Sequence, residues 1–75
     1  MYELEIETKN TWKRIVNPKK ARVRDWLFVQ VLQVIDGDGK WHKICTKSLI
    51  AYPHSVESKI NDAIKNRKKS IYIDI

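Results

Sequence analysis

Apolar and polar residues alternate with a period of two near both ends of the chain. Residues 2–8 read Tyr-Glu-Leu-Glu-Ile-Glu-Thr, so one side is mostly apolar and the other carries three glutamates. Residues 71–75 read Ile-Tyr-Ile-Asp-Ile and repeat the alternation. One apolar face with this period is typical of a half-buried β-strand. The pattern therefore predicts a strand at each of these two places.

Residues 11–16 read Thr-Trp-Lys-Arg-Ile-Val, a short run rich in β-forming residues. The run ends at Asn17-Pro18, a pair that favours a turn. We expect a strand over 11–16, followed by a loop that Lys19 and Lys20 complete. A short helix with Pro18 at its first position is the alternative.

Residues 26–35 form the longest apolar segment and read Trp-Leu-Phe-Val-Gln-Val-Leu-Gln-Val-Ile. Both alternating faces are largely apolar, which predicts a central strand covered on each side. A helix would fit the length, but the β-branched and aromatic residues disfavour it. We therefore expect one continuous strand from Trp26 to Ile35, with Trp26 and Leu32 in the core.

Asp36-Gly37-Asp38-Gly39 follows this segment directly. Asp-Gly pairs supply the positive φ that tight hairpin turns require. Residues 40–47 then return as the partner strand of the hairpin.

The segment after a break at residues 52–55 has helical periodicity. Four apolar residues at spacings of i, i+4, i+7 and i+8 would form one stripe along a helix. These residues are Val56, Ile60, Ala63 and Ile64. Ser55 is a suitable N-cap. Glu57 would lie in the first turn and Lys65 and Arg67 in the last, matching the helix dipole at both ends. The sequence predicts a helix over about 55–67.

Together these elements predict an α+β fold. We expect a small antiparallel sheet of four to five strands with the helix (about 55–67) inserted before the C-terminal strand, in two layers. The chain of 75 residues is expected to form a single small domain over 1–75. A domain of this size buries only about 60% of the surface that its unfolded chain exposes, which leaves little room for a deep pocket.

Positive charge is concentrated in one part of the chain. The sequence has 15 Lys and Arg against 9 Asp and Glu, and seven of the basic residues lie between Lys9 and Arg24 with no acid among them. Cations interleaved with aromatic rings are typical of proteins that bind single-stranded nucleic acid. The candidate binding residues are Trp12, Lys13, Arg14, Lys19, Lys20, Arg22, Arg24, Lys40, Trp41 and Lys43. The alternative is a solvated basic face with the tryptophans in the core.

Signatures of catalysis and of cofactor or metal binding are absent. The sequence has two glycines and therefore no glycine-rich phosphate loop. His42, Cys45 and His54 do not have the spacing of a closed zinc site, and Lys47 stands where a calcium loop needs a glutamate. We expect Cys45 to be a packing residue, and the protein to be no enzyme and to have no cofactor.

The function that these observations favour is a non-catalytic module that binds RNA or DNA through phosphates. The alternative is a small phage or mobile-element accessory protein that inhibits a host protein, offering an edge strand and a basic face to an acidic partner. One cysteine, acidic residues near the N-terminus and no long apolar run favour a cytoplasmic protein without a membrane partner. Edge strands at 2–8 and 71–75 would be covered in a homodimer, which we also expect.

Overall fold

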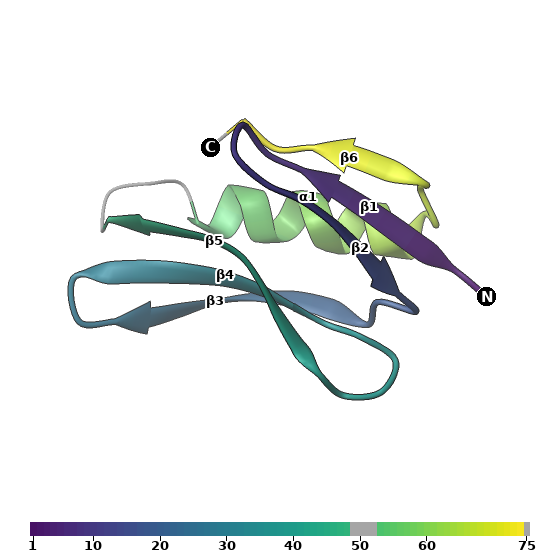
Figure 1. Cartoon of the computed structure of the whole chain (residues 1–75), viewed down its shortest axis with the longest axis horizontal. Helices are drawn as coiled ribbons and strands as arrows, with labels where there is room; N and C mark the ends of the chain where they lie inside the picture. Colours follow the sequence, from purple (N-terminus) through teal and green to yellow (C-terminus); the bar gives the residue numbers. More distant parts are fainter. Residues whose placement is uncertain (49–52, 75) are drawn as a thin grey trace.

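The computed structural model describes residues 1–48 and 53–74, which form two three-stranded sheets and one helix (Figure 1). The elements in chain order are β1 (Glu3–Glu7), β2 (Trp12–Val16), β3 (Lys20–Trp26), β4 (Val29–Ile35), β5 (Trp41–Ser48), α1 (Pro53–Lys65) and β6 (Ser70–Tyr72). The first sheet has the order β2-β1-β6 and the second β3-β4-β5. The expected α+β class is confirmed, but the strands form two small sheets in place of one sheet of four or five strands.

The first sheet forms because β1 and β2 each present one apolar face. Leu4 and Ile6 of β1 and Ile15 of β2 are fully buried, and β1 pairs with β2 in antiparallel register. β6 pairs with β1 in parallel, with Ile6 opposite Ile71. The expectation of an antiparallel sheet is wrong here. Alternation identifies the buried face of a strand but not the direction of its partner, and α1 carries the chain back to the end at which β1 begins (Figure 1).

The segment 26–35 is two strands and not one. β3 ends at Trp26, β4 begins at Val29, and these two residues pair across a turn made of Leu27 and Phe28. This turn escapes prediction because it contains none of the Gly, Asn, Asp or Pro residues that mark hairpins. Leu32 is buried as expected, whereas the side chain of Trp26 lies outside the description.

β3 begins at Lys20, so the loop after β2 consists of residues 17–19 and is not a helix. The alternative of a short helix starting at Pro18 is therefore wrong. Backbone hydrogen bonds at this loop join the two sheets. The Lys19 N–H donates to the Ile35 carbonyl at 2.9 Å, and the Gly37 N–H donates to the Val16 carbonyl at 3.2 Å.

The predicted hairpin turn at residues 36–39 is confirmed. The Asp36 N–H donates to the Lys40 carbonyl at 2.9 Å, and Gly39 has a φ of 86°, which glycine adopts without a steric cost. The Asp36 carboxylate accepts backbone hydrogen bonds from Asp38 at 2.8 Å and Lys40 at 3.0 Å. β5 then returns along β4, with one irregularity in register between Leu32 and Gln33.

The predicted helix is confirmed, but its N-terminus is shifted. α1 begins at Pro53, so Ser55 lies inside the first turn and is not its N-cap. The first turn holds no acid, because Glu57 lies in the second turn. Lys65 is in the last turn as expected, whereas Arg67 follows the helix with a φ of 50°. Proline at the first position is favoured because the N–H that it lacks would have no partner there.

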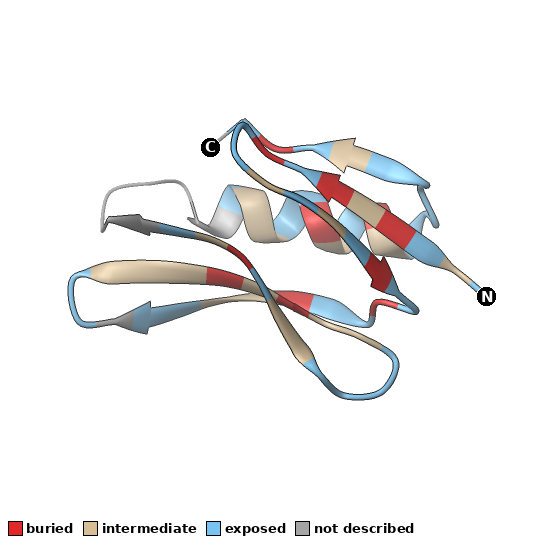
Figure 2. Ribbon diagram, viewed as in Figure 1, coloured by how far each residue is buried: buried red, intermediate tan, exposed pale blue. Residues whose placement is uncertain are grey.

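The two sheets and the helix share one hydrophobic core (Figure 2). Its buried members are Leu4, Ile6, Ile15, Ala21, Leu32, Val34, Ile44, Ile60, Ala63 and Ile73. Ile60 and Ala63 belong to the predicted helical stripe, and Val56 and Ile64 pack against the core from its margin. The strand predicted over 71–75 is β6, but it begins at Ser70 and ends at Tyr72. Ile73 follows the strand into the core, and Ile75 lies outside the described residues.

The helix also covers part of the edge of the second sheet. The Ala21 N–H of the edge strand β3 donates to Asn61 Oδ1 on α1 at 2.9 Å. An uncovered strand edge presents unpaired amides that can recruit another strand. This hydrogen bond fixes α1 against β3 and leaves the opposite face of the sheet free of the helix.

Substitution of Gly37 by Ala tests the junction between the sheets. A Cβ atom at Gly37 would lie 2.8 Å from the Asn17 Cβ, a distance that requires the turn at Gly37 or the loop at Asn17 to move. We expect the change to lower the free energy of unfolding by about 1–3 kcal/mol, as overpacking does. Denaturant unfolding measures the loss, and Asp38→Ala in the same exposed turn is the matched control. Equal stability of the two variants would contradict the close packing.

The Asp36 carboxylate provides a second test, through pH. The hydrogen bond from His42, at 2.7 Å, and the backbone bonds from Lys40 and Asp38 hold the pKa of Asp36 below its ordinary value. A lowered pKa in the folded state stabilises the protein above the unfolded value of about 3.9, and this stabilisation is lost as the pH falls through the folded value.

We therefore expect the Tm of the wild type to exceed that of Asp36→Asn at neutral pH. The difference should narrow as the pH falls below the unfolded value of about 3.9, and it should be lost once the pH passes the lower pKa of the folded protein. Thermal unfolding followed by circular dichroism over a pH series measures it. Asp38→Asn, which alters a carboxylate outside these hydrogen bonds, is the control. A constant difference across the pH series would show that the Asp36 charge has no part in the turn.

Candidate nucleic-acid interface

The outer face of the second sheet gathers the basic residues of β3. Ala21 is buried and Val23 packs against the core, so the alternate positions of the strand point to the other face. The register places Gln33 of β4 beside Arg22 on one side and Lys43 on the other. We call the following residues the basic face: Lys20, Arg22, Arg24, Trp41 and Lys43.

Arg22 is held at the centre of the basic face by two contacts. Its Cζ atom lies 3.6 Å from the centroid of the Trp41 ring, and its Nε donates to Gln33 Oε1 at 2.9 Å. A guanidinium stacked on an indole retains its charge and gains a cation–π attraction. Stacking also restricts the rotamers of the long side chain, so less conformational entropy remains to be lost when an anion binds.

Positive charge on the basic face has no neutralising partner in the described part of the chain. Within residues 1–48 and 53–74, no ion pair involves Lys20, Arg22, Arg24 or Lys43. Lys20 and Arg24 are exposed, and Arg22 is half-buried under its contacts. All four cationic side chains are therefore available to contact one polyanion on this surface, as the binding of a phosphate backbone requires.

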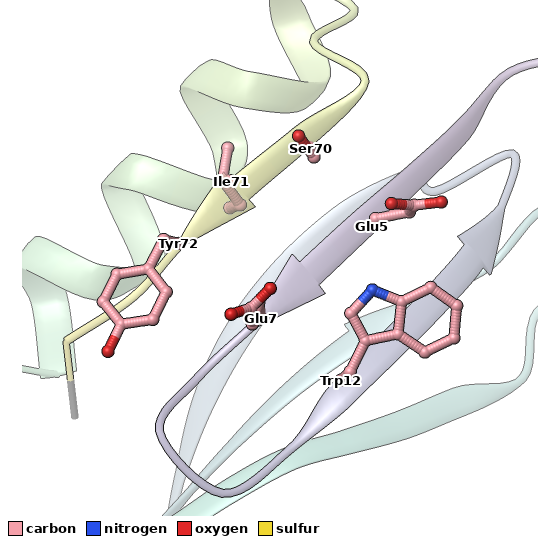
Figure 3. A pocket seen from close by; sticks show the side chains of 6 residues that line it. All are labelled: Glu5, Glu7, Trp12, Ser70, Ile71 and Tyr72. Atoms are coloured by element: carbon pink, nitrogen blue, oxygen red, sulfur yellow. The ribbon is translucent and has the colours of Figure 1, made fainter.

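The outer face of the first sheet has the opposite character. Alternation along β1 directs Glu3, Glu5 and Glu7 outward, and β2 and β6 add two exposed aromatic rings beside them. We call this surface the acidic face. A shallow hollow of about 250 Å³ lies on it (Figure 3), and its lining residues are Glu5, Glu7, Trp12, Ser70, Ile71 and Tyr72.

Trp12 and Arg14, which the sequence predicts to bind nucleic acid, lie on the acidic face. Arg14 Nη2 is 3.2 Å from Glu5 Oε1, and its Cζ lies 5.5 Å from the centroid of the Trp12 ring. Trp12 is 54% exposed, so the alternative that places the tryptophans in the core is wrong for this one. A phosphate near Trp12 would meet the carboxylates of Glu5 and Glu7, which disfavours binding there.

The remaining predicted residues lie between or behind these two faces. Lys13 pairs with Ile6 and is half-buried on the core side of β2. Lys19 is exposed in the loop between the sheets, directly before Lys20, and Lys40 is exposed directly before Trp41. The structure thus brings together the basic residues of β3 and β5 and separates them from those of β2.

Two features of the second sheet were not predicted. Gln33 orients Arg22 through a hydrogen bond, whereas the sequence predicts only that Gln33 belongs to a buried strand. Leu27 and Phe28 form an exposed apolar tip on the β3–β4 hairpin, and neither residue carries a local signal for a turn. The spacing of residues along the sequence reveals neither feature, because both depend on the position of the turn between β3 and β4.

The residues that sequence reasoning considered for metal or thiol chemistry do not gather into a site. Among the described residues, no three His, Cys, Asp or Glu side chains are grouped so as to hold a metal ion. His42 Nε2 lies 2.7 Å from Asp36 Oδ2, and Cys45 is half-buried against the core. The side chain of His54 lies outside the description.

Comparison of this chain with protein-family models, with curated protein sequences and with solved structures finds no match. No helix in the described part of the chain has the length and apolar character needed to cross a membrane. The geometry of the two faces is therefore the basis for a functional assignment.

Proposed function

We propose that this protein is a non-catalytic module that binds single-stranded nucleic acid through the basic face. The observation that carries the proposal is the arrangement of Arg22, which stacks on Trp41 at 3.6 Å and is hydrogen-bonded to Gln33. A guanidinium held in this way presents its remaining N–H groups in a fixed fork, the geometry that suits a phosphate.

The neighbours of Arg22 extend this phosphate site along the sheet. Lys20 and Arg24 lie two residues to either side of it on β3, about 6.6 Å away along the strand. Lys43 lies across β4 on the same rung. Contacts of this kind position a nucleic-acid backbone but carry no sequence information. The proposed binding is therefore electrostatic and tolerant of sequence.

The acidic face supports a one-sided mode of binding. Glu3 and Glu7 have no ion-pair partner among the described residues, so this surface repels a polyanion. A strand that approaches the protein is steered to the second sheet. The basic face carries four cationic side chains, whereas the acidic face carries three glutamates and Arg14. The two faces thus differ in the sign of their charge, and phosphate is expected to bind the basic one.

Neutralising the basic face tests the proposal. The variant combines Lys20→Gln, Arg22→Gln, Arg24→Gln and Lys43→Gln. We expect it to bind a labelled single strand of mixed sequence more weakly than the wild type. Counterion release predicts that the slope of log affinity against log salt falls by about 0.7 for each phosphate contact that is lost. Fluorescence anisotropy over a salt series measures both quantities.

The matched control removes the same charge elsewhere, with Lys9→Gln, Lys65→Gln, Lys68→Gln and Lys69→Gln. We expect this variant to retain most of the salt slope. Equal weakening by both variants would mean that net charge, and not the basic face, attracts the strand. The proposal would be overturned if the wild type did not bind single strands at physiological salt but formed a complex with an acidic protein through the basic face. That result would favour the inhibitor function.

A further inference from the structure

The tip of the β3–β4 hairpin exposes two large apolar side chains. Leu27 is 77% exposed and Phe28 is 80% exposed, and together they form the two-residue turn between the strands. The turn lies at one end of the second sheet, remote from the turn between β4 and β5 (Figure 1). Two adjacent exposed apolar residues at a projecting tip reduce solubility without contributing to the core.

The backbone of this turn is strained by its own sequence. Leu27 has a φ of 55°, a conformation that glycine and asparagine adopt readily and leucine does not. Two-residue hairpin turns with positive φ at the first position ordinarily have glycine there for this reason. The fold of the hairpin would therefore be served better by small polar residues. Strain that local structure does not require is typical of functional positions.

We propose that Phe28 and Leu27 contact the faces of unpaired bases in the strand that the basic face binds, an inference that rests on the proposed function. Charge on the same hairpin identifies the occupant. Arg24 lies three residues before Leu27, about 10 Å along the strand, and continues the row of cations towards the tip. The carboxylate of Asp25, the next residue, accepts a hydrogen bond from Gln30 Nε2 at 3.2 Å and lies on the opposite face of β3 from Arg24.

Unpaired bases fit this tip better than a duplex does. An apolar wedge that enters a duplex must unstack a base step, and proteins recover this cost by wrapping a long stretch of bent duplex. The basic face lies on a single short sheet and offers no surface around which a long stretch of duplex could wrap. Unpaired bases expose their faces already, so an aromatic ring such as Phe28 can stack on one of them without that cost.

The double variant Leu27→Gly with Phe28→Asn tests the inference, because it places glycine at the position with positive φ and removes both apolar side chains. We expect its Tm to equal or exceed that of the wild type. Its affinity for a single strand should fall by about 5-fold to 150-fold, the range for loss of one stacked base. The salt slope should not change, because no cation is removed. A strand that carries 2-aminopurine reports the contact, since its emission should change with the wild type and not with the variant.

Phe28→Trp is the matched control and should retain the affinity, since it keeps an aromatic face at the tip. Unchanged affinity of the double variant, while the wild type binds with a steep salt dependence, would overturn the tip contact and leave the proposed function standing. Failure of the wild type to bind single strands would overturn both. A third outcome is that the double variant binds with the affinity of the wild type but sediments as a monomer where the wild type sediments as a dimer. That outcome would assign the tip to self-association and overturn the inference.

Discussion

Alternation along the strands is the constraint on which the rest of this structure depends. Each sheet turns one face to a core that both sheets share with the helix. The second face of each sheet carries exposed side chains, such as Trp12 and Tyr72 on the first sheet and Lys20 and Arg24 on the second. Both outer faces therefore remain in contact with solvent, and their side chains are free to differ in charge without disturbing the core.

The loop at residues 17–19 determines how charge is distributed between these faces. The basic segment from Lys9 to Arg24 is continuous in sequence, but the loop passes the chain from the first sheet to the second. Arg14 consequently pairs with Glu5, whereas Arg22 stacks on Trp41. Hydrogen bonds from Lys19 to Ile35 and from Gly37 to Val16 fix this crossing. The separation of an acidic from a basic face is thus a consequence of one short connection.

Local patterns in the sequence predict the elements better than their arrangement. The strands at 2–8 and 11–16, the turn at 36–39 and the helical stripe follow from periodicity and turn chemistry, and each is present. The division of residues 26–35 could not be predicted, because a Leu-Phe turn at positive φ contradicts the propensities on which such predictions rest. The parallel pairing of β6 depends on contacts distant in sequence, which alternation does not encode.

The same limit applies to the candidate site. Composition identified Arg22, Arg24, Trp41 and Lys43 as candidates because cations and aromatic rings are interleaved in the sequence. It could not separate them from Trp12 and Arg14, since the assignment of a strand to a sheet is a tertiary property. Gln33 was not identified because its role depends on the register of β3 against β4. The sequence shows which side chains could bind nucleic acid, whereas only the fold shows which of them lie together on one face.

The central claim is that nucleic acid binds the second sheet and not the first. Titration of the isotopically labelled protein with a short single strand, followed by backbone amide chemical shifts, tests this claim most directly. We expect shift changes over 20–24, 27–31 and 41–46, with β1, β2 and β6 unaffected. Changes centred on the acidic face, or no changes at physiological salt, would contradict the account.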